Sequence, residues 1–202
     1  MGTMPTGVHL RDVRKQLFDA AERVLLRDGP NALTSRAVTT EADVAKGVLH
    51  RHFADFDDFL AELVRDRIAR LADQAALLHA AAGTRTVAEN LVDALTELFD
   101  PVTVALSSLI FFRDELRTRL RHRGNGLPLL VEAREMLAAY LSAEREQGRI
   151  AADADVDSLA LSLIGSAHLL FAGRPRETLP DTEELAKTVH TITADAIQRR
   201  LL

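Results

Sequence analysis

The sequence contains no cysteine and no tryptophan, and only one tyrosine among its 202 residues. Without thiols the chain can form neither a disulfide framework nor a thiolate metal site, and we expect it to work in a reducing compartment, by default the cytoplasm. Aromatic residues make up 4% of the sequence, and glycine and proline are also few, at 10 and 6. This scarcity, combined with abundant alanine, leucine and arginine, favours helices over sheets.

Long apolar runs are lacking as well. No uninterrupted run approaches the ~20 residues that span a bilayer, and Met1–Val8 lacks the pattern of a signal peptide. We therefore expect no membrane partner. The formal net charge of −5 disfavours a molecule that binds polyanions with its whole surface, but it leaves a local basic surface open.

Helical periodicity runs almost from end to end, with breaks where Gly, Pro or Asp cluster. These breaks predict helices over residues 10–28, 34–42, 45–52, 56–81, 86–99, 102–123, 127–147, 156–171 and 182–201. Gly29-Pro30 ends the first helix, because glycine suits the left-handed cap and proline forbids continuation. We expect an all-α fold in two parts, an N-terminal three-helix domain at 8–55 and a C-terminal helical bundle at 56–202. The functions expected of these two domains, DNA binding for the first and ligand binding and dimerisation for the second, follow from the patterns described next.

The segment from Thr34 to Phe53 has the layout of a helix-turn-helix. Thr34 can cap the first short helix, and a tight turn follows at Asp43. Val38 and Leu49 can pack the two helices together, which frees the second helix to enter a major groove about 12 Å wide.

Residues on both sides of this segment resemble the N-terminal signature of the TetR family of repressors. The matching positions are Arg14, Leu17-Phe18, Ala20-Ala21, Gly29, Thr34, the run Ala42–Phe53, and Phe59-Leu60. The resemblance implies that residues around Ala45–Val48 contact base edges. It also implies phosphate contacts from Thr34, Lys46, His50 and His52. The whole implied DNA-binding set is Thr34, Ser35, Arg36, Ala45, Lys46, Gly47, Val48, His50, Arg51 and His52.

The segment departs from the family pattern in its turn and its charge. Asp43 replaces the turn glycine, and Ala45 replaces the Ser or Thr that would cap the recognition helix. Nine basic and ten acidic residues lie between Leu10 and Arg65. We therefore predict few phosphate contacts and a log–log salt slope near about −4 for a pair of half-sites.

A protein that recognises a short DNA half-site gains specificity when two copies bind two half-sites together, so we expect a homodimer. The last two predicted helices are apolar on more than one side, and such helices are buried on more than one side. The family resemblance likewise implies an interface formed by these helices. Its candidate residues are Leu159, Leu163, Ala167, Leu170, Leu185, Val189, Ile192 and Ala196. The alternative is that both helices complete a monomeric bundle.

The middle helices are expected to enclose a small-molecule site. Its candidate lining residues combine apolar bulk with a few polar tips: Phe99, Leu109, Phe111, Phe112, Met136, Tyr140, His168 and Phe171. Taken singly, each of them is also a plausible core residue. Arg113 and His122 could meet an anionic group. However, basic residues clustered in this way are more typical of a solvated helix face paired with Asp114 and Glu115. The cluster consists of Arg113, Arg117, Arg119, Arg121, His122 and Arg123.

The sequence thus predicts a transcriptional regulator, a repressor that binds a palindromic DNA operator as a dimer and is released by a small, largely apolar effector. An enzyme is the first alternative, but no histidine has an acidic residue three or four positions before it, and no nucleophile or phosphate-loop motif occurs. We expect no catalytic residue, metal site or cofactor. A helical interaction module with a vestigial helix-turn-helix is the second alternative.

Overall fold

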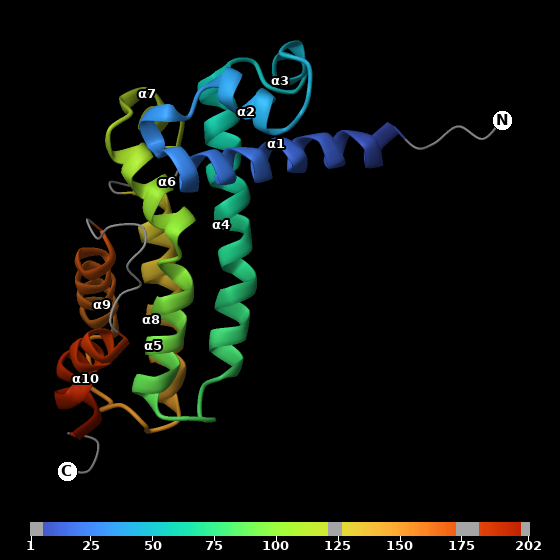
Figure 1. Ribbon diagram of the computed structural model, residues 1–202. Helices are drawn as coiled ribbons and strands as arrows, with labels where there is room; N and C mark the ends of the chain where they lie inside the picture. The colour runs from blue at the N-terminus through green and yellow to red at the C-terminus, as the bar shows by residue number, and fades with distance from the viewer. Residues whose placement is uncertain (1–5, 121–126, 173–181, 199–202) are drawn as a thin grey trace. The chain divides into compact units, whose positions relative to one another are not determined.

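The computed structural model describes residues 6–120, 127–172 and 182–198, and these form ten α-helices, one short 3₁₀ helix and no strand (Figure 1). The predicted all-α fold class is confirmed. By packing, the chain divides into two compact units. Unit 1 comprises residues 1–65 and 105–122, and unit 2 comprises residues 66–104 and 123–202. The predicted boundary between residues 55 and 56 separates functions rather than packing, and it stays a prediction.

Unit 1 begins with α1 (Thr6–Asp28), a long helix on which η1 and α2 pack, and α3 packs in turn on α2. It continues with η1 (Pro30–Ala32), α2 (Ser35–Glu41), α3 (Gly47–His52), the start of α4 (Phe56–Ala80), the end of α6 (Pro101–Phe111) and α7 (Asp114–Leu120). In Figure 1, α2 and α3 lie close to each other at one end of this unit. Its core is aliphatic and aromatic, with Leu17, Leu49 and Phe59 fully buried.

The end of α1 follows the prediction. Gly29 has φ 89°, in the left-handed region that glycine adopts without a side-chain penalty, and its N–H donates to the carbonyl of Leu25 at 3.1 Å. Pro30 then opens η1 instead of prolonging α1. The chain is thereby redirected so that α2 packs back on α1.

Unit 2 contains the rest of α4 and the start of α6, together with α5 (Val87–Leu98), α8 (Pro128–Glu146), α9 (Val156–Phe171) and α10 (Thr182–Gln198). Helix α8 packs on α9, and α10 packs against α5 and α9. Thr86 and Glu89 form a reciprocal capping box at the start of α5, and Asp155 caps α9 by accepting from the Ser158 N–H at 3.1 Å. By length and composition no single described helix reaches a membrane span, whereas the bent pair α5 and α6 does.

The prediction of one helix over residues 102–123 is wrong. The chain leaves α6 after Phe111 and starts α7 at Asp114, although neither glycine nor proline marks the break. The Arg117 side chain donates to the Phe111 carbonyl and pairs with the Asp114 carboxylate, so it bridges the two helix ends. Residues 121–126, which include the end of the predicted helix, lie outside the described residues.

Candidate nucleic-acid interface

The helix-turn-helix is formed by local hydrogen bonds. The Thr34 hydroxyl accepts from the Ala37 N–H at 3.1 Å and caps α2, as predicted. Asp43 adopts φ 52° at the turn, a conformation that Asp tolerates better than most residues. The Val44 N–H then donates to the Thr39 carbonyl at 3.0 Å and closes the turn. Helix α3 starts at Gly47, two residues later than predicted, and receives no side-chain cap.

Aromatic packing fixes the end of α3. Phe53 ends this helix, and its ring centre lies 5.9 Å from that of Phe18 on α1 and 5.0 Å from that of Phe59 on α4. The Arg14 guanidinium lies 4.6 Å from the centre of the Phe53 ring and donates to Glu62 at 2.8 Å. Helix α3 therefore sits on a rigid support of two other helices.

Ion pairs also hold α2 on α1. Glu41, at the end of α2, accepts from Arg23 and from Arg27, each at 2.7 Å. These two guanidinium groups lower the pKa of the Glu41 carboxyl. In addition, the Gln16 amide donates to the Ala42 carbonyl at 2.8 Å. These contacts could not be predicted from the sequence, because partners 14 to 26 residues apart follow no helical spacing.

Most of the predicted DNA-binding residues face outward. Ser35 and His52 are half-buried, and the exposed members of the set are Thr34, Arg36, Ala45, Lys46, Gly47, His50 and Arg51. Val48 differs, because it is only 9% exposed and belongs to the inner face of α3 with Leu49. Its side chain is part of the core of unit 1, which argues against the predicted contact between this side chain and bases.

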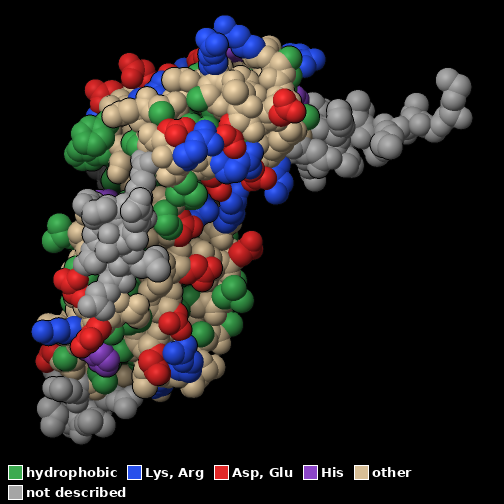
Figure 2. Space-filling model, viewed as in Figure 1, with side chains coloured by type: hydrophobic (Ala, Val, Ile, Leu, Met, Phe, Trp, Pro, Cys, Tyr) green, Lys and Arg blue, Asp and Glu red, His purple; other side chains and the backbone are tan. Residues whose placement is uncertain are grey.

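Three cations of the helix-turn-helix form no ion pair with the described part of the protein. Within residues 13–65, Arg36, Lys46 and Arg51 form no ion pair, whereas the other basic side chains each do. Figure 2 shows Lys and Arg side chains at the end of unit 1 that carries α2 and α3. Three unpaired cations of this segment therefore lie in the part of unit 1 that the sequence assigns to DNA binding.

The carboxylates that follow α3 are paired. Asp55 binds Arg119 through two hydrogen bonds of 2.8 and 2.7 Å, and this guanidinium lowers the pKa of Asp55. Asp57 pairs with Arg113 at 2.9 Å. The predicted partners Asp114 and Glu115 are therefore wrong for Arg113 and Arg119, whereas Arg117 does pair with Asp114. These pairs neutralise acidic residues near the recognition helix.

The eight predicted effector residues are divided between the two units. Leu109, Phe111 and Phe112 belong to unit 1, and the other five belong to unit 2. Phe111 and Phe112 are 57% and 82% exposed, because α6 ends between them. In unit 2, Phe99 stacks on Phe171 with ring centres 5.3 Å apart and packs beside His168 at 6.0 Å. The His168 Nδ1 atom is buried and has no hydrogen-bond partner among the described residues.

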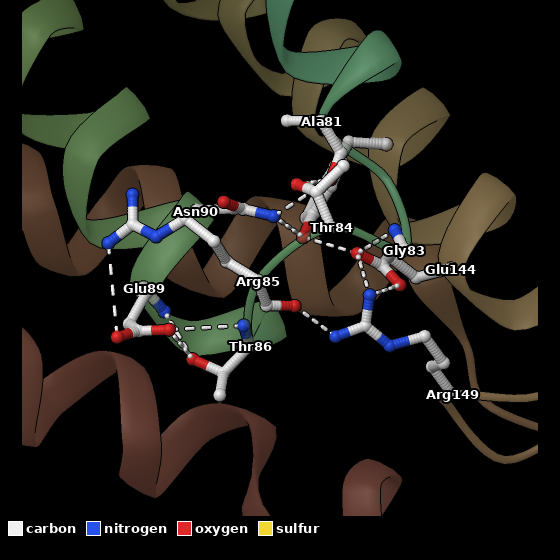
Figure 3. A network of polar contacts seen from close by, with 10 residues as sticks. Ala81, Gly83, Thr84, Arg85, Thr86, Glu89, Asn90, Glu144 and Arg149 are labelled. Atoms are coloured by element: carbon white, nitrogen blue, oxygen red, sulfur yellow. Dashed lines mark hydrogen bonds and ion pairs between the residues drawn. The ribbon is translucent and has the colours of Figure 1, made fainter.

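Tyr140 lies in a buried polar network of unit 2. Its hydroxyl donates to the fully buried Glu144 carboxylate at 2.6 Å and accepts from the Asn90 amide at 3.1 Å. Figure 3 shows how Glu144 also receives the Gly83 N–H at 3.3 Å and pairs with Arg149 at 3.2 Å. Burial and the bond to Glu144 raise the pKa of Tyr140. The network fastens the loop between α4 and α5 to α8.

Met136 remains near open space. It lines a hollow of about 230 Å³ in unit 2, together with side chains of α4 and α5. Most of those neighbours are polar, including Asn90, Asp93 and Glu97. Leu77, Leu78 and Ala94 supply apolar side chains to the same hollow.

The predicted dimer residues are mostly inside the chain. Five are buried, namely Leu163, Ala167, Leu185, Val189 and Ala196. Leu159, Leu170 and Ile192 are half-buried, and the first and last of these line a hollow of about 380 Å³ between α9 and α10. The stripe that the sequence assigned to a partner copy is thus the stripe that packs α9 and α10 within unit 2. The exposed apolar side chains of α9 are Leu161 and Leu169, at 58% and 78%.

A helix-turn-helix with an outward, cationic second helix is the architecture of a DNA-binding transcriptional regulator. The family model for bacterial regulatory proteins of the tetR family matches residues 17–63. The matched segment runs from the middle of α1 into α4 and contains the whole helix-turn-helix, so it is in this segment that the chain is similar to the tetR family.

Solved structures share the fold beyond that segment. The fatty acid degradation regulator FadR from Bacillus halodurans is 19% identical, over 89% of this chain and 93% of its own, with a TM-score of 0.68. A TetR-family member from Streptomyces coelicolor A3 is 24% identical, over 89% and 97%, with a TM-score of 0.61. FadR from Bacillus subtilis, in complex with stearoyl-CoA, is 16% identical, over 91% and 97%, with a TM-score of 0.66. No curated protein matches the sequence.

Proposed function

We propose that this regulator is a repressor that binds a palindromic operator as a homodimer and leaves it when a small molecule binds. The observation that carries the proposal is the set of unpaired cations on α2 and α3, namely Arg36, Lys46 and Arg51. Phosphate contacts from such side chains provide affinity, and the exposed start of α3 at Lys46-Gly47 meets the base edges. The DNA-binding set is the predicted one without the Val48 side chain.

The dimer interface of this proposal uses the exposed face of α9. Leu161, Gly165 and Leu169 recur every four residues and lie on one face of the helix, and all three are exposed. A Cβ atom added at Gly165 would meet nothing within 4 Å, so this face has room for the close approach of a second helix. Two large leucines left in water on one helix favour burial by a partner of the same kind.

The effector acts by population shift. A molecule that binds more tightly to the conformation with misplaced half-sites lowers DNA affinity by the ratio of its two affinities. The stearoyl-CoA found with the Bacillus subtilis regulator supports an effector with a large apolar part. Inside unit 2, the unpartnered His168 Nδ1 beside Phe99 and Phe171 offers a polar contact for such a molecule.

Substitution of Gly47 tests the DNA-binding surface directly. A Cβ atom at Gly47 would meet nothing within 4 Å, so Gly47→Ala and Gly47→Leu leave the fold intact. Both side chains would instead collide with DNA, and overpacking of this kind weakens binding about tenfold or more. The readouts are band shifts on fragments selected from a genomic library and the thermal midpoint of unfolding. Ala139→Leu, at an exposed position of α8, is the matched control.

Two results would count against the proposal. If no fragment is retained in the selection, the chain is better described as a helical interaction module whose helix-turn-helix no longer binds DNA. If the Gly47 and Ala139 variants lose DNA affinity equally, DNA binding does not use α3.

A further inference from the structure

Unit 1 contains a cleft that the DNA-binding surface does not explain. We call it the α2–α6 cleft, since its walls come from η1, the start of α2, the start of α4 and the end of α6. Its volume is about 410 Å³, within the range of small-molecule pockets. The lining residues are Pro30, Asn31, Leu33, Thr34, Ser35, Phe56, Ser108, Leu109, Phe112 and Arg113.

The chemistry of the lining is amphipathic and has one sign of charge. Half of the lining side chains are apolar, and the Phe112 ring, 82% exposed, is held edge-on by Phe111 with ring centres 5.2 Å apart. Arg113 is the single charged side chain among the lining residues, and its guanidinium lies 5.6 Å from the centre of the Phe56 ring. Its Nε atom pairs with Asp57 at 2.9 Å, so the anionic group of a ligand would bind to the two terminal nitrogens. Apolar walls with one cation favour a ligand with an apolar body and an anionic group.

A second observation also points to a ligand. The Ser35 hydroxyl oxygen is buried and has no hydrogen-bond partner among the described residues, although the side chain lines the cleft. A buried polar atom without a partner is costly, and a bound donor or acceptor removes that cost. A second protein chain with an apolar surface would suit this cleft poorly, because it would leave the Ser35 hydroxyl oxygen without a hydrogen bond.

We propose that the α2–α6 cleft binds a small amphipathic anion with an aromatic or similarly compact apolar body, and that this binding weakens DNA binding. Thr34 and Ser35 belong both to the cleft and to the DNA-binding set, so one occupant changes the surface that the other needs. The ligand site stands on its own evidence, and only the effect on DNA rests on the proposed function. An effector at this cleft acts on the start of α2 itself.

A matched pair of fluorescent probes tests the site in the full-length protein. 8-Anilino-1-naphthalenesulfonate carries an aromatic body and a sulfonate, and N-phenyl-1-naphthylamine has the same ring systems without the charge. We expect saturable binding of the sulfonate at one site per chain. Phe112→Ala, which removes an exposed ring and spares the core, should weaken it about tenfold. Leu77→Ala, at a leucine 70% exposed in unit 2, should leave it unchanged.

Arg113→Gln identifies the charge preference. It should weaken sulfonate binding roughly threefold, as expected for a partly exposed charge pair, and leave the uncharged probe unaffected. Equal losses for both probes would overturn the anionic class. Absence of saturable binding, or equal effects of Phe112→Ala and Leu77→Ala, would overturn the site. Binding that falls as protein concentration rises would also overturn it, because a second copy would then cover Phe112.

DNA affinity measured without and with the sulfonate probe separates the two proposals. Loss of DNA affinity with probe in the wild type, but not in Phe112→Ala, supports the coupling. Probe binding with unchanged DNA affinity would overturn the coupling. If the protein binds the probe at the cleft and binds no DNA at all, the ligand site stands while the repressor proposal fails.

Discussion

The salt dependence of operator binding follows from the count of unpaired cations. Arg36, Lys46 and Arg51 are the basic side chains of residues 13–65 without an ion pair, which gives three in each copy and six in a dimer. With a slope of about −0.9 for each neutralised phosphate, the log–log slope should be about −5. Over a fourfold rise in salt, this corresponds to a loss of affinity of about a thousandfold.

Lys46→Ala sharpens this prediction. Two phosphate contacts disappear from the dimer, so the slope should become shallower by about 2 while the protein stays folded. Lys187→Ala removes the same exposed charge from α10 and should leave the slope unchanged. The assay is fluorescence anisotropy on a labelled operator across a series of KCl concentrations. A pH well above the ordinary histidine pKa of about 6.5 keeps added histidine charge out of the measurement.

Two results of the salt titration would contradict the predicted slope. A wild-type slope steeper than about −8 would mean that paired arginines leave their carboxylates and bind DNA. An unchanged slope in Lys46→Ala would mean that α3 does not carry the phosphate contacts. Either result would show that the ion pairs within the protein do not determine the salt dependence of DNA binding.

Three further outcomes concern the rest of the molecule. Tyr140→Phe should lower the free energy of unfolding by about 1–2 kcal/mol in a urea titration, because a buried carboxylate loses a donor, and unchanged stability would contradict this. Arg119→Ala should lower the free energy of unfolding at neutral pH. Because Arg119 holds the pKa of the Asp55 carboxyl below its ordinary 3.8, the difference in stability between variant and wild type should shrink as the pH falls below that value. A stability difference that persists in acid would contradict the pairing. Leu169→Glu should convert the dimer to a monomer in sedimentation experiments, while Leu77→Glu, an equally exposed leucine on α4, should leave the dimer intact. A wild type that already sediments as a monomer would refute the dimer.

The parts of the fold that local signals determine could be predicted from the sequence. Thr34, Gly29 and Pro128 each act on the backbone within a few residues, and the structure has the cap, the stop and the helix start at those positions. The break between α6 and α7 escaped prediction because it depends on Arg117, whose side chain bridges the two helix ends, rather than on a residue that interrupts helices.

The candidate sites could be predicted only in part, because their residues contact partners that are far away in the sequence. A helix with apolar residues on two sides shows that both sides are covered, but periodicity does not say by which neighbour. Leu163 and Val189 were therefore assigned to a partner copy, whereas they pack within unit 2. The same limit applies to Asp57 and Arg113, which are 56 positions apart in the sequence and 2.9 Å apart in the fold. Only the folded chain reveals which arginines are already engaged.

Asp43, in the turn of the helix-turn-helix, lies at a position where a single substitution could change the affinity for DNA. Asp43 is exposed and holds φ 52°, a conformation that asparagine adopts equally well. A change to asparagine keeps the turn and deletes a negative charge beside the operator. Under the proposed function, Asp43→Asn should therefore bind the operator more tightly than the wild type, without a change in the turn.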